Sequence, residues 1–190
     1  SEVYGQPEHY PIGESWPINP LNPYAVSKAA QEQLARIYEA SYGFPIVITR
    51  AFGYINPRRA NLSLTNFARQ IVQIERGASK VLKHGNMDSI RTFCDARDVA
   101  RAYVLASHFP GRVFNIGATE PMSIWQALEA LKALSNRPIP CEVDPALIRP
   151  LDVTKIIPDV SAFRQATGWQ PLYSFAESLD WLMAECRGQS

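Results

Sequence analysis

The sequence predicts an α/β fold built around a parallel sheet, on two observations. In the first part of the chain, a short β-branched segment at 46–49 lies between two segments with helical apolar spacing, 24–42 and 62–76. Such alternation of helix and strand is typical of α/β proteins with a parallel sheet. The second half adds more helical patterns with scattered short strands, which indicates a smaller mixed part.

The first segment, Ser-Glu-Val-Tyr-Gly (1–5), predicts the end of a buried strand that runs into a turn at Gly5. Because a strand end needs a strand before it, we expect the chain to be a fragment that begins in the middle of a fold. Five prolines from Pro7 to Pro23 then exclude regular structure from the loop that follows.

The longest predicted helix spans 24–42. Asn22 and Pro23 form its entry, since proline is favoured in the first turn of a helix. Its apolar spacing rests on four residues: Ala30, Leu34, Ile37 and Tyr38. Gly43 ends it, and a strand from 46 to 49 follows.

The remaining elements alternate between helices, strands and polar loops. A turn at 56–61 precedes a helix at 62–76, which has Phe67, Ile71 and Ile74 on one side and stops at Gly77. A further helix begins at about Asp98, and a strand follows within 112–118. Capping boxes at Ser123–Gln126 and Ser174–Glu177 open two more helices, with a loop at 167–171 before the second.

The composition is that of an ordinary globular protein and excludes several function classes. Hydrophobic residues make up 46% and charged residues 19% of the 190 residues, and the net charge of +1 does not favour nucleic acid or a membrane surface. No apolar run approaches the ~20 residues of a membrane span, and the first residues do not resemble a signal peptide. The three cysteines are far apart and show no metal-ligand or disulfide spacing. We therefore predict inert thiols in a reducing cytoplasm, and no metal.

Tyr24 and Lys28 are candidates for acid–base chemistry. Residues four apart share a helix face, so both side chains are expected in the same site. A tyrosine ordinarily has a pKa near ~10, and an adjacent ammonium lowers it by favouring the phenolate. Such a pair can move a proton on and off a hydroxyl. The same spacing occurs by chance on many helices, so an ordinary helix start remains an alternative for the pair alone.

Two stretches together carry a family resemblance. Ser-Glu-Val-Tyr-Gly, followed downstream by Tyr-x-x-x-Lys, resembles the extended short-chain dehydrogenase/reductase family, the NAD-dependent nucleotide-sugar epimerases and dehydratases. The dehydratases of that family carry an acidic residue where this chain has Glu2. The resemblance implies that Glu2, Tyr24 and Lys28 are catalytic, and that Tyr24 and Lys28 also bind the cofactor. A Ser or Thr of the family motif falls immediately before Ser1 and is absent.

Three later stretches narrow the resemblance, which is closest to GDP-mannose 4,6-dehydratase. Residues 55–62 resemble a loop of that enzyme, and 85–103 resemble a segment of the GDP-sugar dehydratases and their reductase relatives. Residues 144–171 resemble the C-terminal segment of the whole family. The resemblance implies five substrate-binding residues: Asn56, Arg59, Arg91, Arg149 and Asp152. Arg91 is expected to grip the nucleotide diphosphate, because a guanidinium fork pairs with phosphate oxygens. Arg149 is expected to bind the substrate, and Asp152 the ribose or base.

The chain also departs from the family pattern at two positions. Gly53 stands where the family usually has an asparagine that contacts the substrate, and Asn56 follows three residues later. Thr92 replaces an acidic residue after Arg91. Substrate contacts in the loop after Gly53 are therefore in question.

The resemblance implies the C-terminal part of a Rossmann-type doubly wound parallel sheet plus a smaller mixed α/β substrate-binding domain. Residues 1–56 are assigned to the NAD(P)-binding domain with its Tyr/Lys helix. Residues 57–190 are assigned mainly to the substrate domain, with segments around 92–117 returning to the sheet. The glycine fingerprint G-x-x-G-x-x-G does not occur in the chain. We therefore expect that an N-terminal part is missing and that the chain alone is inactive.

The implied activity is that of an NADP- or NAD-dependent nucleotide-sugar 4,6-dehydratase, which converts GDP-mannose to GDP-4-keto-6-deoxymannose by internal hydride transfer. Tyr24 is expected to take the O4 proton and Glu2 the C5 proton. A GDP-4-keto-6-deoxy-sugar reductase and a nucleotide-sugar 4-epimerase are alternatives. An epimerase needs no C5 base, so Glu2 favours the dehydratase, although decarboxylating relatives carry the same stretch. A non-catalytic sugar-nucleotide-binding domain is the alternative of another class.

The expected partner is a sugar nucleotide, without nucleic acid or membrane. The resemblance also implies a homodimer or homotetramer of the complete protein, assembled through helices that include 24–42. The expected location is the cytoplasm.

Overall fold

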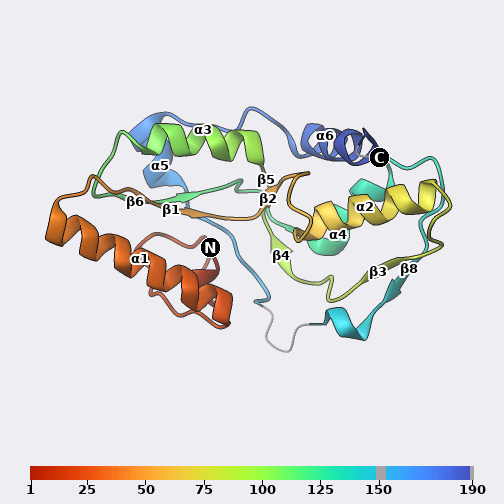
Figure 1. Ribbon diagram of the computed structural model, residues 1–190, viewed down its shortest axis with the longest axis horizontal. Coiled ribbons are helices and arrows are strands. Elements are labelled where there is room, and N and C mark those ends of the chain that lie inside the picture. Colours follow the sequence, from red (N-terminus) through yellow and green to blue (C-terminus); the bar gives the residue numbers. More distant parts are fainter. Residues whose placement is uncertain (149–152, 189–190) are drawn as a thin grey trace.

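The structure is a computed structural model that describes residues 1–148 and 153–188. The described residues form the following α-helices (Figure 1): α1 (Pro23–Tyr42), α2 (Ser63–Glu75), α3 (Ala96–Ala106), α4 (Ile124–Lys132), α5 (Ser161–Thr167) and α6 (Phe175–Gly188). Their strands are β1 (Ile48–Ala51), β2 (Tyr54–Ile55), β3 (Leu82–His84), β4 (Ile90–Arg91), β5 (Cys94–Asp95), β6 (Val113–Ile116), β7 (Met122–Ser123) and β8 (Cys141–Val143). Two short 3-10 helices are η1 (Glu2–Tyr4) and η2 (Pro145–Leu147).

Parallel pairing joins strands that lie far apart in the sequence. β1 pairs with β6, and β2 pairs with β5, both in parallel. β3 and β8 form a third parallel pair, whereas β4 and β7 are antiparallel. Helix α3 connects β5 to β6 and lies on the side of the β1–β6 pair opposite to α1 (Figure 1). The predicted α/β fold with parallel strands is confirmed.

The helix ends follow the caps that the sequence predicts. Asn22 caps α1, and Gly43 ends it in the left-handed region with φ of 69°. Both predicted capping boxes form. At α4 and α6 the cap hydroxyl accepts a backbone N–H, and the side chain three residues on accepts the N–H of the cap residue; the pairs are Ser123–Gln126 and Ser174–Glu177. The helix predicted at 62–76 is α2, and the predicted loop at 167–171 separates α5 from α6.

Three predicted boundaries are wrong. Residues 2–4 form η1 rather than the end of a strand, because two adjacent apolar side chains are buried in one tight turn. The strand predicted at 46–49 is shifted by two residues to β1, since pairing with β6 sets its start. Helix α3 begins at Ala96 rather than near Asp98, because the side chain of Asp95 accepts the N–H of Arg97 and caps it.

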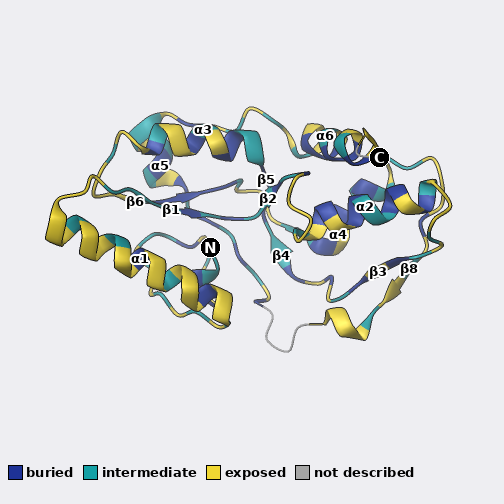
Figure 2. Ribbon diagram, in the orientation of Figure 1, coloured by how far each residue is buried: buried dark blue, intermediate teal, exposed yellow. Residues whose placement is uncertain are grey.

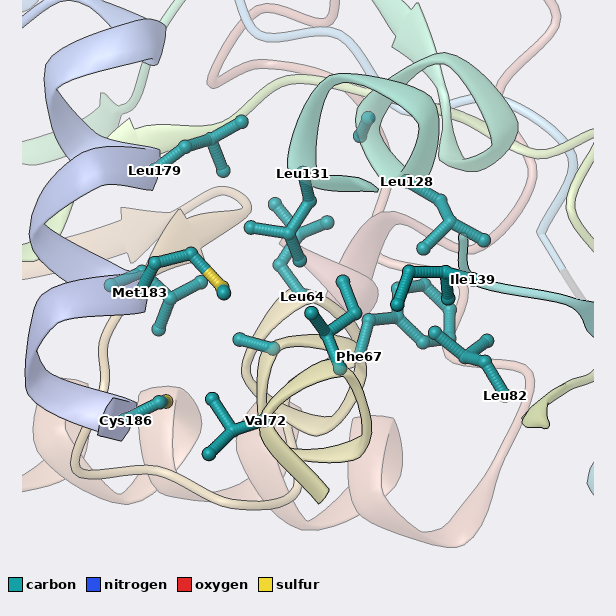
Figure 3. Close-up of a cluster of buried hydrophobic side chains, with 14 of the residues drawn as sticks. Leu64, Phe67, Val72, Leu82, Leu128, Leu131, Ile139, Leu179, Met183 and Cys186 are labelled. Atoms are coloured by element: carbon teal, nitrogen blue, oxygen red, sulfur yellow. The ribbon is translucent and has the colours of Figure 1, made fainter. Parts of the chain in front are cut away.

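The described apolar residues gather in separate buried clusters. The first cluster lies where α2, α4 and α6 meet (Figure 3), and it contains Leu64, Phe67, Ile71, Leu128, Leu131 and Leu182. The second surrounds β6, α3 and α5, and contains Phe114, Phe163 and Trp169. The third packs η1 against the residue after β1 and contains Val3, Tyr4, Ile12 and Phe52. The predicted inner face of α2 is confirmed, since Phe67, Ile71 and Ile74 are all buried.

Candidate active site

The predicted Tyr–Lys pair lies in the first turns of α1. The Lys28 ammonium is 5.6 Å from the centre of the Tyr24 ring, so both side chains share one face. Both are exposed, Tyr24 to 54%. Lys28 Nζ donates to Gln31 Oε1 at 2.9 Å, and the Tyr24 hydroxyl has no hydrogen-bond partner among the described residues. The two polar groups are therefore accessible to a ligand, which fits the expected contacts with a hydroxyl and a nicotinamide ribose.

Glu2 lies against the beginning of the same helix. Asn22 Nδ2 donates to Glu2 Oε2 at 2.9 Å, while Asn22 Oδ1 accepts the N–H of Ala25 at 2.8 Å. One short side chain thus connects η1 to the cap of the helix that carries Tyr24. The three predicted catalytic residues are gathered around the N-terminal end of α1.

A buried network of polar side chains holds α1 and η1 against the strands β1 and β6. Arg50 of β1 donates through Nε and Nη2 to both oxygens of Glu32 of α1, at 2.9 and 2.6 Å. Its Nη1 donates to the Tyr4 hydroxyl at 2.7 Å, and that hydroxyl donates to Asn115 Oδ1 at 2.7 Å. Arg50 and Glu32 are each only 6% exposed. The network fixes η1, α1, β1 and β6 to one another.

The charges of this network stabilise each other. Burial by itself would raise the pKa of Glu32, but hydrogen bonds from Arg50 and Arg36 hold it below its ordinary value of 4.5. Burial raises the pKa of Tyr4 above 10.0 against the opposing effect of Arg50, so the Tyr4 hydroxyl stays neutral. An ionised Glu32 and a neutral Tyr4 are the forms that accept the hydrogen bonds of Arg50.

Sequence reasoning missed this network, although one signal was present. Arg50 stands within the apolar stretch that forms β1, where an isolated charge needs a buried partner. Glu32 lies four residues after Lys28, one helical turn further along α1. A charged residue in an apolar strand and an acid on the neighbouring helix could have suggested the pair. The sequence did not show that the two would meet.

Two of the predicted substrate-binding residues lie in the turn after β2. Asn56 Oδ1 accepts the N–H of Arg58 at 3.0 Å, so its side chain stabilises the predicted polar turn. Arg59 is exposed and donates to the Tyr54 hydroxyl at 2.6 Å. The structure therefore gives Asn56 a role within the chain, while the exposed Arg59 guanidinium is accessible to solvent.

Arg91 of β4 is half-buried and contacts backbone carbonyl groups. Its Nη1 donates to Ile90 O at 2.9 Å and its Nη2 to Val153 O at 2.6 Å. It also lies near Tyr10, whose pKa is raised by burial while the positive charge of Arg91 acts in the opposite direction. The predicted substrate residues Arg149 and Asp152 lie outside the described residues.

Close packing explains why glycine stands at position 53. A Cβ atom built on Gly53 would lie 2.4 Å from Thr92 O, far inside van der Waals contact. The backbone of Gly53 also accepts the N–H of Cys94 at 2.9 Å, which holds β5 against β2. An asparagine at this position would require the segment of Thr92 to move. The two departures from the family pattern are therefore neighbours in space.

Surface cavities lie elsewhere in the molecule. One of about 530 Å³ is formed by the end of α4 and residues 137–140, and another of about 460 Å³ lies beside the start of α5. None of the described site residues lines either cavity. Within residues 1–148 and 153–188, no group of three or more His, Cys, Asp or Glu could hold a metal ion. No helix of the described chain is long and apolar enough to span a membrane.

Comparison with known proteins identifies the family. Residues 1–181 match the family described as GDP-mannose 4,6 dehydratase. The chain is 30% identical to the GDP-6-deoxy-D-mannose reductase of Pseudomonas aeruginosa over 190 aligned positions, and the match covers 97% of this chain and 62% of the relative. It is 29% identical to the GDP-mannose 4,6-dehydratase of Vibrio cholerae over 202 aligned residues, covering 90% of this chain and 54% of the relative.

The solved structures agree. The structure of RMD from Pseudomonas aeruginosa complexed with NADPH has a TM-score of 0.91 and 27% identity, and the match covers 100% of this chain and 65% of that one. Other solved relatives hold NAD. The family therefore uses NADP or NAD, and the fold is of the Rossmann type. The chain spans between half and two thirds of the length of these relatives. It belongs to the GDP-mannose 4,6-dehydratase family of NAD(P)-dependent nucleotide-sugar dehydratases, reductases and epimerases.

Proposed function

We propose that this chain carries the acid–base residues and the sugar-nucleotide half-site of a 4,6-dehydratase, with GDP-mannose as substrate and GDP-4-keto-6-deoxymannose as product. One observation supports this choice above the others. Glu2 is hydrogen-bonded to the cap of the helix that bears Tyr24 and Lys28. A dehydratase needs a base for C5 beside the acid–base tyrosine, whereas a 4-epimerase does not.

The chain's own residues divide the proton transfers between them. Tyr24 takes the proton from O4, and the Lys28 ammonium lies 5.6 Å from the centre of its ring. NADP or NAD, when bound, would supply the acceptor for the C4 hydride and, after elimination, the donor of a hydride to C6. The ketone formed at C4 acidifies the C5–H bond, and Glu2 removes that proton. The C6 hydroxyl leaves as water with the proton that Glu2 has taken, which forms a C5–C6 double bond. Addition of hydride at C6 and of a solvent proton at C5 then gives the 6-deoxy product.

On the substrate side, arginine side chains bind the nucleotide diphosphate. Arg59 is exposed next to β2, and Arg91 lies in β4 with part of its surface accessible. Guanidinium groups suit diphosphate oxygens because they form paired, charge-assisted hydrogen bonds. Arg149 and Asp152 keep their predicted roles in binding the substrate and the ribose or base, and Asn56 acts by shaping the turn that carries Arg59.

The test uses the complete cofactor-loaded protein that carries this chain. GDP-mannose turnover is measured together with exchange of the C5 hydrogen for solvent deuterium. Tyr24→Phe is expected to lower C4 oxidation by about a hundredfold or more, because the O4 proton loses its acceptor. Glu2→Gln is expected to leave C4 oxidation in place and to lower C5 exchange by a similar factor. No turnover of GDP-mannose by the unmodified protein would contradict the proposal.

A GDP-4-keto-6-deoxy-sugar reductase is the second candidate, supported by the 30% identity with the Pseudomonas aeruginosa reductase. The two activities differ in the role of Glu2. A reductase or a 4-epimerase works without C5 exchange, so its turnover should hardly respond to Glu2→Gln. A protein that binds sugar nucleotides but turns none of them over would instead be the non-catalytic binding domain.

The proposal extends to organisation and assembly. We assign residues 1–56 and the returning segment 92–117 to the cofactor domain, and most of 57–190 to the substrate domain. The chain alone is expected to be inactive, since it covers only part of its relatives.

The complete protein is expected to form a homodimer or homotetramer through α1, whose outer face exposes Leu34 and Ile37. A cytoplasmic location is consistent with its free thiols.

A further inference from the structure

Asn22 makes side-chain hydrogen bonds with both ends of its amide group. Its carbonyl oxygen accepts the N–H of Ala25 and caps α1, and its amide nitrogen donates to Glu2 Oε2. The backbone bond decides which end of the amide is which, because an N–H can bond only to the oxygen. The nitrogen is therefore directed at Glu2 by the helix itself.

Asn22 is also the only hydrogen-bond partner of the Glu2 carboxylate among the described residues. The guanidinium of Arg50 donates to Glu32, Tyr4 and the backbone oxygen of Glu14. Glu2 Oε1 remains without a hydrogen bond in the described structure. One carboxylate oxygen is thus held and the other is available to accept a proton.

A neutral amide is a suitable partner for a carboxylate that acts as a base. A Lys or Arg at the same distance would orient the carboxylate but would also favour its ionised form, which makes it a weaker proton acceptor. An amide restricts the position of the carboxylate with a smaller effect on its basicity. Because Asn22 lies two residues before Tyr24, it also ties that position to the tyrosine.

We propose that Asn22 is a positioning residue that uses the helix cap to hold the Glu2 carboxylate in place for removal of the C5 proton. This inference rests on the proposed dehydratase function. It assigns to Asn22 a role in the elimination step and none in the oxidation at C4.

The first test concerns the contact itself and needs no activity. In a nuclear magnetic resonance spectrum of the chain, the Asn22 side-chain amide protons are expected to exchange slowly with water and to show a nuclear Overhauser contact with the Glu2 side chain. Glu2→Ala should abolish both the slow exchange and the Overhauser contact. The backbone amide of Ala25 should stay protected from exchange, since the cap of α1 is intact. Rapid exchange of the Asn22 amide in the unmodified chain would overturn the proposal.

The second test separates the two half-reactions in the complete cofactor-loaded protein. Asn22→Gly removes the donor to Glu2, and glycine is tolerated at an N-cap with little loss of helix stability. It is expected to slow C5 deuterium exchange about tenfold or more, the size expected for loss of a hydrogen bond to a charged group. C4 oxidation, followed by the absorbance of the reduced nicotinamide, should be nearly unchanged, so that reduced cofactor accumulates.

Ser123→Gly is the matched control, because it changes the cap of α4 away from Glu2. Ser123→Gly should leave the ratio between the rates of C4 oxidation and C5 exchange unchanged. Equal slowing of both half-reactions by Asn22→Gly would show a merely structural role and overturn the assignment of Asn22. Absence of C5 exchange in the unmodified protein would instead overturn the proposed dehydratase function, and the catalytic role of Asn22 with it.

Discussion

Helices α1 and α2 are both amphipathic, but they are held in opposite ways. α2 buries its apolar residues against α4 and α6, whereas α1 buries Ala25 and Glu32 and turns Leu34 and Ile37 to solvent. Figure 2 shows α1 mostly in the colour of exposed residues and α2 largely in that of buried ones. The comparison teaches that apolar spacing predicts a helix without predicting which face the chain covers. The helix that carries the candidate catalytic residues is attached through polar groups.

The largest loss of stability is expected on changing Arg50, which attaches α1 to the sheet. Arg50→Met leaves the Glu32 carboxylate buried without its main partner, which should lower the free energy of unfolding by about 3–5 kcal/mol. Urea unfolding of the chain measures it. Adding Glu32→Leu should recover much of the loss, because it removes the unpaired charge. If the double variant is no more stable than Arg50→Met, the ion pair does not hold α1 in place.

A somewhat smaller effect is expected in the core of the other helix. Ile71 of α2 is fully buried in the cluster shared with α4 and α6. Ile71→Ala should lower the free energy of unfolding by about 2–4 kcal/mol through lost burial and a remaining cavity. Urea unfolding again provides the measurement. A loss below about 1 kcal/mol would mean that α2 is not packed as described.

Acid should affect the polar attachment of α1 before it affects the apolar core. The pKa of Glu32 is held below its ordinary 4.5 in the folded chain. Its contribution to stability is therefore complete above pH 4.5 and is lost as the pH falls through the lower folded pKa. Asp95, lowered from 3.8 by Arg97 and Ser178 against the effect of burial, should behave in the same way at lower pH. We expect the free energy of unfolding, measured between about pH 6 and pH 3, to depend less steeply on pH in Glu32→Gln than in the unmodified chain.

The smallest effect on stability is expected on the outer face of α1. Leu34 is 57% exposed, so Leu34→Ala should change the free energy of unfolding by about 0.5 kcal/mol or less. Leu34→Lys should instead weaken self-association of the complete protein, because it places a charge in the proposed contact surface. Sedimentation velocity measures the assembly. Unchanged assembly would exclude this face from the subunit contact.

Local signals in the sequence located most elements of the fold. The caps at Asn22, Ser123 and Ser174 and the stops at Gly43 and Gly77 mark helix ends because they act within one or two turns of chain. The predicted strand end at 1–5 was wrong for the complementary reason. A short apolar stretch is buried equally well in a strand or in a turn, and its partners here include Phe52, directly after β1, and Val153 and Ile156.

Residues close together in the sequence were enough to predict most helix boundaries, the shared face of Tyr24 and Lys28, and the family to which the chain belongs, whereas the start of α3 was misplaced. These properties depend on residues within a few positions of one another or on whole motifs. Three contacts could be seen only in the folded chain: Arg50 pairs with Glu32, Asn22 donates to Glu2, and Gly53 lies against Thr92. Each of these contacts joins separate elements, so it depends on how the chain packs in three dimensions. The spacing of residues along the sequence does not predict such long-range contacts.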